Sequence, residues 1–235
     1  HGIRDRSPSR GLGDVYKRQL LELWKRESVD YSHVSIHPEA PTGIYFVTHD
    51  TDGHHFSYYR SGSAACQMTP LDVPKDDLVK TRILHLSAIT QAISESSCKT
   101  SFAAIHHARK HGVKVSYDTN LRLKLWSLEC ARDVINRTVP LCEVLLPSLE
   151  DVTSLTGLRD PDAITEYYLE LGAKLVVLKQ GSHGARVSDG KDNLNIPTPS
   201  VCFVTGINCV LSILILHTCC LLYTSPSPRD GLLSR

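Results

Sequence analysis

The hydrophobic positions in the middle of the chain follow two spacings that alternate along the sequence. Short apolar runs that are typical of buried strands occur at residues 83–87, 113–118, 142–147 and 173–179. Apolar positions three and four apart, which predict helices, occur at residues 90–111, 127–137, 148–156 and 161–171. Strands that alternate with helices of this length predict a parallel α/β sheet with right-handed crossovers.

A different pattern comes before this alternation. Residues 20–27 have helical spacing, and residues 42–48 then alternate between polar and apolar side chains. Asp52-Gly53 is a strong hairpin signal, and the run HFSYYR after it reads as a returning strand. We therefore expect an antiparallel hairpin over residues 42–60 that is an appendage to the sheet.

Composition and charge favour a small-molecule protein. The net charge is +1, with 41% hydrophobic and 22% charged residues, so nothing indicates a nucleic-acid partner or a membrane surface. Eight cysteines without a CxxC pair indicate reduced thiols in a cytoplasmic protein. His49, His54 and His55 lie close together, but their spacing lacks the patterns of zinc sites, and we expect no metal site there.

Both ends of the chain look foreign to the rest. The reverse complement of one back-translation of SRGLGDVYKRQ, residues 9–19, encodes CLLYTSPSPR and begins an Asp codon, as at residues 220–230. The two ends therefore read as opposite strands of one DNA element, similar to a sequencing adapter. We expect residues 1–19 and 220–235 to be non-native and poorly packed. Without them, the apolar run from residue 210 is too short for a membrane anchor.

Polar clusters follow three of the predicted strands, where ligands bind in open α/β sheets. They are DTNLR at residues 118–122, PSLED at 147–151 and KQGSHG at 179–184. The last could present backbone N–H groups and Lys179 to phosphate oxygens, or it could be a simple turn between two strands. Arg122 could hold a carboxylate or phosphate by two hydrogen bonds, or it could form a surface ion pair with Asp118.

The second strand of the hairpin offers another candidate site. Strand alternation places Tyr58 and Arg60 on one face and Tyr59 on the other. These side chains could cover a ligand bound at the sheet, or they could serve only to pack an edge strand. A glycine-containing turn, two arginines and a covering hairpin together suit phosphoryl transfer to a small acidic molecule.

Six segments of the chain resemble PfkB-type (ribokinase-like) carbohydrate kinases, above all the branch that acts on 2-keto-3-deoxygluconate. They are PTGIYFVTH, FSYYRSGSAA, ILHLSAITQAIS, VSYDTNLRLKLW, LLPSLEDVTSLTG and VVLKQGSHGA. The resemblance covers about residues 20–199, so we read residues 20–200 as a kinase-domain fragment. It implies an α/β ribokinase-like three-layer sandwich with a parallel central sheet and a β-hairpin lid, incomplete at both ends.

The resemblance also implies a reaction and its partners. The reaction is phosphorylation of 2-dehydro-3-deoxy-D-gluconate to its 6-phosphate with ATP and Mg²⁺, and the lids of such kinases often pair in a homo-oligomer. Substrate-binding positions are then Tyr58, Tyr59, Arg60, Asn120 and Arg122. ATP-binding positions are Asn120, Ser148, Lys179, Gly181, Ser182 and Gly184. Asp151 has the place of an acid that supports the metal indirectly.

The sequence departs from the family at several points. Ala88 replaces a usual glycine, and the family's amino-terminal glycine-rich segment is absent. The family signature D-x-x-G-A-G-D, whose last Asp is the general base, aligns with FVTGINC, which keeps Gly206 but has Cys209 at the base. We read residues 201–219 as a corrupted anion-hole region and expect this fragment to be inactive. A ribokinase- or fructokinase-like kinase and a non-catalytic sugar-acid-binding relative remain as alternatives.

Overall fold

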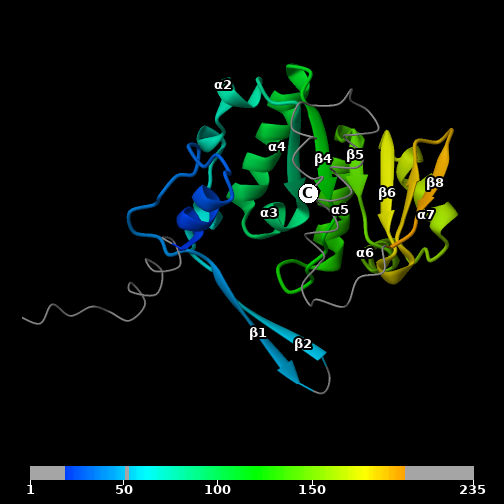
Figure 1. Cartoon of the computed structure of the whole chain (residues 1–235), viewed down its shortest axis with the longest axis horizontal. Coiled ribbons are helices and arrows are strands. Elements are labelled where there is room, and N and C mark those ends of the chain that lie inside the picture. Colours follow the sequence, from blue (N-terminus) through cyan, green and yellow to red (C-terminus); the bar gives the residue numbers. More distant parts are fainter. Residues whose placement is uncertain (1–18, 51–52, 199–235) are drawn as a thin grey trace, which may run out of the picture.

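The computed structural model describes residues 19–50 and 53–198, which form one α/β sheet and a separate hairpin (Figure 1). The six-stranded sheet has the order β3-β4-β5-β6-β7-β8. Its strands are β3 Ile83–Ser87, β4 Lys114–Asp118, β5 Val144–Leu146, β6 Leu175–Lys179, β7 Ala185–Ser188 and β8 Asn193–Ile196. The hairpin consists of β1 Ile44–Asp50 and β2 Gly53–Tyr59. The ribokinase-like α/β architecture expected from the sequence is confirmed.

The sheet is parallel in one half and antiparallel in the other. Strands β3 to β6 run parallel, in a register that places Ser87 beside Asp118 and Asp118 beside Leu146. Strands β7 and β8 then pair antiparallel to β6 and to each other. The parallel central sheet expected from the sequence is confirmed for β3 to β6. Strands β7 and β8 extend it in the antiparallel direction, because short turns rather than helices connect β6, β7 and β8.

Helices pack against one face of the sheet and enclose the main core. They are α2 Lys75–Leu78, α3 Ala88–Ala92, α4 Glu95–Lys110, α5 Leu128–Thr138, α6 Leu149–Thr156 and α7 Pro161–Glu170. Residues 19–26 are also helical, and short 3-10 turns are η1 Ala64–Gln67, η2 Pro70–Asp72, η3 Val139–Leu141 and η4 Gly181–His183. The side chains of Tyr117, Leu145 and Leu178 alternate onto this face and are fully buried in the cluster that α4 to α7 cover. The buried Tyr117 hydroxyl donates to Gln91 Oε1, 2.5 Å away.

The prediction of one helix over residues 90–111 is wrong in its first part. The segment forms two helices, because Ser87 accepts a hydrogen bond from the Ile89 N–H and Ser94 accepts one from the Ser97 N–H. Each serine is an N-cap with extended backbone, so a new helix begins after each. Gly112 ends α4 in the left-handed region, as expected from the sequence.

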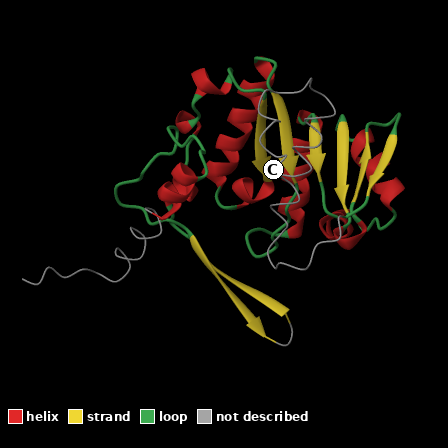
Figure 2. Ribbon diagram, in the orientation of Figure 1, coloured by secondary structure: helices red, strands yellow, loops and turns green. Residues whose placement is uncertain are grey.

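The hairpin projects away from the sheet, at the end where β3 to β6 terminate (Figures 1 and 2). Its register pairs Tyr45 with Tyr58 and Phe46 with Ser57, as the Asp-Gly turn predicts. The side chains of Tyr45, Phe46 and Tyr59 are each at least half exposed. Within the residues that the structure describes, no helix is long and apolar enough to cross a membrane.

Some sequence predictions fall outside the described residues. These are the non-native character of residues 1–18 and 220–235 and the corrupted region 201–219 with Gly206 and Cys209. The side chains of His49, His54 and His55 are not described either, although their backbones belong to the hairpin. The predictions made for these residues remain predictions.

Candidate functional site

A buried ion pair joins the ends of two strands that are not neighbours in the sheet. The Lys179 Nζ atom, at the end of β6, lies 2.9 and 3.0 Å from the two carboxylate oxygens of Asp118, at the end of β4. Asp118 is 6% exposed and Lys179 8% exposed. The pair crosses the end of β5, and it therefore draws together the polar loops that follow β4 and β6.

The loop after β4 takes its shape from the same carboxylate. Asp118 Oδ1 also accepts a hydrogen bond of 3.2 Å from the backbone N–H of Asn120, whose φ of 24° is positive. Asparagine tolerates this region better than most residues, because its short polar side chain can bond locally. Arg122 follows, with its Nη1 atom donating to the Leu121 carbonyl over 2.7 Å. Asp118 thus positions the turn that carries Asn120 and Arg122.

The start of α6 completes the rim of the site. Ser148 caps the helix by accepting a hydrogen bond from the Asp151 N–H, as the sequence predicts. Thr119 Oγ1 donates to Asp151 Oδ2 over 3.2 Å, which ties the loop after β4 to the first turn of α6. The structure therefore brings together at one rim the predicted residues Asn120, Arg122, Ser148, Asp151 and Lys179.

Burial and charge act in opposite directions on Asp151. Burial raises the pKa of this carboxyl, while hydrogen bonds from Leu121 and Ser148 and the charges of Arg122 and Lys179 lower it in part. Burial dominates, so the native structure favours the protonated acid more than water does. A destabilised carboxylate at the end of a sheet is a common feature of functional sites.

The segment KQGSHG connects β6 to β7, as in the simpler of the two interpretations from the sequence. The Gln180 N–H donates to the Gly184 carbonyl over 2.8 Å, and η4 lies between them. A Cβ atom at Gly184 would lie 2.0 Å from the Ile196 carbonyl oxygen, which explains the glycine. Ser182 and Gly181 are exposed at the tip of the turn, and their contact with ATP remains a prediction.

Within the part of the chain that it describes, the structure does not form the ion pair between Asp118 and Arg122 that was one of the two interpretations of this segment. Asp118 pairs with Lys179 instead. The Lys179 ammonium is directed at a carboxylate inside the sheet end, so its charge is largely compensated. Arg122 is then the cation of this rim whose charge a ligand can use.

The hairpin residues divide between two faces as the alternation predicts. The Arg60 guanidinium lies 5.1 Å from the centre of the Tyr58 ring, while Tyr59 packs edge-on against Phe46 on the other face. Arg60 Nε is buried without a hydrogen-bond partner among the described residues. Within the same residues, no hydrogen bond or ion pair joins residues 58–60 to the rim.

The sequence analysis missed a polar pair beside the rim. His85 on β3 has its Nδ1 atom 3.1 Å from Ser116 Oγ on β4, and Ser116 lies on the same face of its strand as Asp118. Partial burial lowers the pKa of His85, and the Asp118 charge opposes this effect. Ser116 and Asp118 are two residues apart on one strand, which indicates from the sequence that they share a face. The partner of Ser116 on β3 could not be predicted, because it depends on the order of the strands in the sheet.

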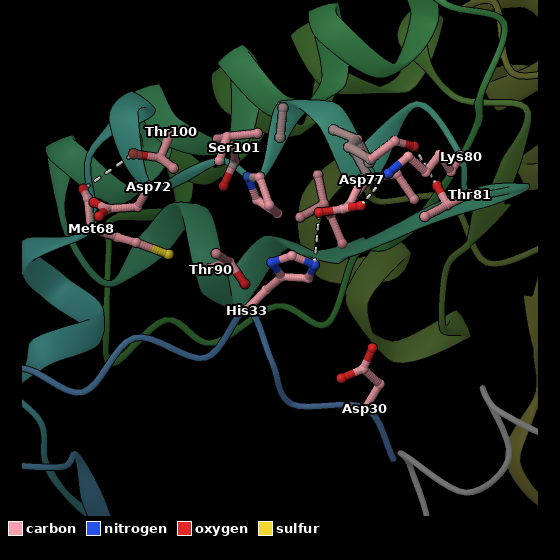
Figure 3. Close-up of a pocket in the computed structure, with 16 residues that line it drawn as sticks. Asp30, His33, Met68, Asp72, Asp77, Lys80, Thr81, Thr90, Thr100 and Ser101 are labelled. Carbon is pink, nitrogen blue, oxygen red and sulfur yellow. Dashed lines mark hydrogen bonds and ion pairs between the residues drawn. The ribbon is translucent and has the colours of Figure 1, made fainter. Parts of the chain in front are cut away.

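A cavity of about 440 Å³ lies between β3, α2 and α4, and none of the rim residues lines it (Figure 3). Leu78, Leu84 and Leu86 give it an apolar wall. The charged side chains at its mouth bind one another, since Asp77 contacts both His33 and Lys80. It therefore lacks the convergent polar groups of a substrate site. Among the described residues, no three His, Cys, Asp or Glu side chains are grouped to hold a metal ion.

Comparison with known proteins shows a consistent family. A family model described as pfkB family carbohydrate kinase matches residues 13–205. A 2-dehydro-3-deoxygluconokinase from Thermoproteus tenax is 36% identical over 187 residues, 74% of this chain and 54% of the relative. The probable fructokinase-7 from Arabidopsis thaliana is 33% identical over 178 residues, 74% of this chain and 52% of the relative. The chain thus spans about half the length of these curated relatives.

Solved structures share the fold. A PfkB protein from Polaromonas sp. JS666 superposes with a TM-score of 0.73 at 34% identity, covering 78% of this chain and 63% of that one. The fructokinase from Vibrio cholerae O395 in a form bound to fructose, ADP and a calcium ion gives 0.68 at 25% identity, covering 79% and 60%. Since the family model covers most of the sequence and the fold agrees, the chain belongs to the PfkB family of carbohydrate kinases.

Proposed function

We propose that the complete protein phosphorylates the 6-hydroxyl of 2-dehydro-3-deoxy-D-gluconate with ATP. The observation that carries this proposal is the Thr119–Asp151 hydrogen bond, which fixes the DTNLR loop against the first turn of α6. Arg122 stands on this loop, and its guanidinium can bind a carboxylate or a phosphate by two hydrogen bonds. An acidic sugar needs such a cation, whereas a neutral sugar does not.

The other rim residues suit the nucleotide. Kinases of this family use ATP with a divalent cation. Asn120 and Ser148 would contact the nucleotide, with Lys179, Gly181, Ser182 and Gly184 along its border. Mg²⁺ usually keeps several waters and binds phosphate oxygens with one or two carboxylates. Asp151, the rim carboxylate that accepts from Thr119, would support this ion through water.

The hairpin would act as a lid over the sugar acid. Tyr58, Tyr59 and Arg60 are the residues proposed to contact the substrate. The Arg60 guanidinium lies 5.1 Å from the centre of the Tyr58 ring and is only partly buried as a residue, and its terminal nitrogens would donate to a carboxylate. The exposed aromatic side chains of Tyr45, Phe46 and Tyr59 support pairing of two lids in a homo-oligomer. A cytoplasmic location belongs to the same proposal, because the enzyme consumes ATP.

A fructokinase-like activity is the second candidate, because the Arabidopsis relative is nearly as similar as the Thermoproteus one. The two candidates differ in the charge of the substrate. Arg122→Lys keeps the charge and removes the two-pronged geometry, and Arg122→Ala removes both. If the sugar acid is the substrate, binding should weaken in the order wild type, Arg122→Lys, Arg122→Ala. If fructose is the substrate, the two variants should differ little.

The experiment is an ADP-release assay with the sugar acid and with fructose. We expect the product of the complete gene to prefer the sugar acid and this chain to give no turnover, because a thiol at Cys209 is a poor replacement for the carboxylate base. The Thermoproteus enzyme is the positive control. Preference for fructose would contradict the substrate, and a complete gene product that binds the sugar acid without turnover would be a non-catalytic relative.

A further inference from the structure

Two histidine rings lie against each other on the surface of α4, at the end of the helix that precedes β4. His107 and His111 are four residues apart, which places them on one face of the helix. Their ring centres are 4.4 Å apart, and the rings are inclined by 41°. His111 is exposed and His107 partly so, and solvent therefore reaches the pair.

The hydrogen bond of His111 determines which nitrogen carries the proton in the neutral ring. His111 Nδ1 lies 2.9 Å from the backbone carbonyl oxygen of His107. A carbonyl oxygen can only accept, so Nδ1 donates and Nε2 keeps its lone pair. Imidazoles that bind metals usually donate their other ring N–H to a carbonyl or carboxylate in this way, which fixes the ring and its tautomer.

The position on the helix also favours a cation. Both histidines belong to the last turn of α4 or its cap, where the carbonyl ends of the helix concentrate partial negative charge. Arg109 is on the opposite side of the helix, and its Nη1 atom is 3.5 Å from the Pro140 carbonyl. Lys110 is adjacent to the pair, and its positive charge opposes the binding of a cation. The two-ligand chelate has to overcome this repulsion.

Three other described histidines are engaged differently. His33 pairs with Asp77, His85 contacts Ser116, and the ring of His106 stacks on Phe102. Among the described residues, His107 and His111 form the one contact between two imidazole rings. Two neutral imidazoles without a carboxylate select zinc, nickel or copper over magnesium, which prefers oxygen ligands.

We propose that His107 and His111 form a surface binding site for a divalent transition-metal ion such as Zn²⁺, with water completing its coordination. The ion would join the last two turns of α4 and stabilise them. This site is separate from the Mg²⁺–ATP chemistry of the proposed kinase, and it does not depend on that activity.

The test is calorimetric titration of the full chain with ZnCl₂ in millimolar Mg²⁺. We expect His107→Ala and His111→Ala each to weaken one binding event by about tenfold or more, because the second ligand of a chelate acts at high effective concentration. The double variant should lose one equivalent of Zn²⁺. The matched control is His106→Ala, one position away on the same helix, which should bind as the wild type does.

Two results would overturn the proposal. One is a double variant that binds as many equivalents of Zn²⁺ as the wild type with the same affinities. The other is an equal loss of binding in His106→Ala, which would indicate a general effect on the helix. Circular dichroism of each variant shows whether α4 is retained, and thermal unfolding with and without Zn²⁺ gives a second measurement, since the ion should raise the midpoint only where both histidines are present.

Discussion

Lys179 and Asp118 are 61 residues apart in the chain, yet the ammonium of one lies within 3.0 Å of both carboxylate oxygens of the other. They belong to β6 and β4, with β5 between them. Both side chains are buried, so each charge is compensated by the other inside the protein. The pair also holds the turn at Asn120, and it therefore connects the stability of the sheet to the geometry of the proposed site.

Removing one member of this pair should destabilise the protein strongly. Lys179→Met or Asp118→Asn leaves a buried charge without its partner, which costs about 3–5 kcal/mol of unfolding free energy. The double variant should recover part of this loss, because no unpaired charge remains. Urea denaturation measures all three. The exposed pair Glu95–Lys99 provides the control, and Glu95→Ala should change stability little. Single variants that unfold like the control would contradict the assignment of a buried pair.

A Cβ atom at position 184 should be more harmful than one at position 157. Gly184 and Gly157 have similar positive φ values, 86° and 83°. A Cβ at Gly157 meets nothing within 4 Å, whereas at Gly184 it would collide with the Ile196 carbonyl. Gly157→Ala should cost about 1 kcal/mol for the left-handed backbone alone. Gly184→Ala should cost more, because its ψ of −137° lies in a region that essentially only glycine adopts, and because β8 must also move. Equal losses in thermal unfolding would show that β8 does not pack against the turn.

The raised pKa of Asp151 predicts a specific dependence of stability on pH. The native state holds this proton more tightly than the unfolded state, whose pKa is near 3.8. The contribution of Asp151 to stability is therefore complete below that pH and is lost as pH rises through the native pKa. Asp151→Asn removes the titration and should make the protein relatively more stable at pH 7 than at pH 4, compared with the wild type.

This comparison needs a control that perturbs the surroundings of Asp151 but keeps its titrating carboxyl group. Thr119→Val removes the hydroxyl that donates to Asp151 but leaves the acid in place. Thr119→Val should keep the wild-type direction of the pH dependence, which Asp151→Asn should abolish at this site. Unfolding free energies measured from pH 4 to pH 8 distinguish the two. A wild-type profile that is parallel to that of Asp151→Asn would exclude a raised pKa.

The periodic parts of the sequence predicted the parallel half of the sheet and the hairpin well. Runs such as LVVLK are wholly buried, which is typical of a strand in the centre of a sheet. The signal fails for β7 and β8, because ARVS and NLNI are short and partly polar, as suits strands that join the sheet by turns. The local pattern of a segment carries no information about the register between strands that are distant in the sequence. That register brings Lys179 and Asp118 into contact.

The candidate site was likewise predictable only in its local features. The cap at Ser148 and the grouping of three loops follow from local rules and from the common direction of parallel strands. The partners of Asp118, His85 and Arg60 do not, because each depends on which element lies beside it. Side-chain pairing across the sheet is a property of the tertiary structure, and the sequence could only supply candidates for it.

The break between α3 and α4 leads to a last prediction. Helical spacing of apolar residues continues through it, and the sequence therefore favours Thr90 as the cap of one long helix. In the structure Ser94 caps α4, and its hydroxyl also donates to the Cys66 carbonyl over 2.6 Å, which ties the segment after the hairpin to the helix.

Ser94→Ala should cost about 1 kcal/mol or somewhat more, since it removes a cap and a tertiary hydrogen bond together. Thr90→Ala should cost less, because Thr90 lies within α3 and caps nothing there. Chemical denaturation of the two variants decides the matter, and a larger loss for Thr90→Ala would mean that one continuous helix starts at Thr90 after all.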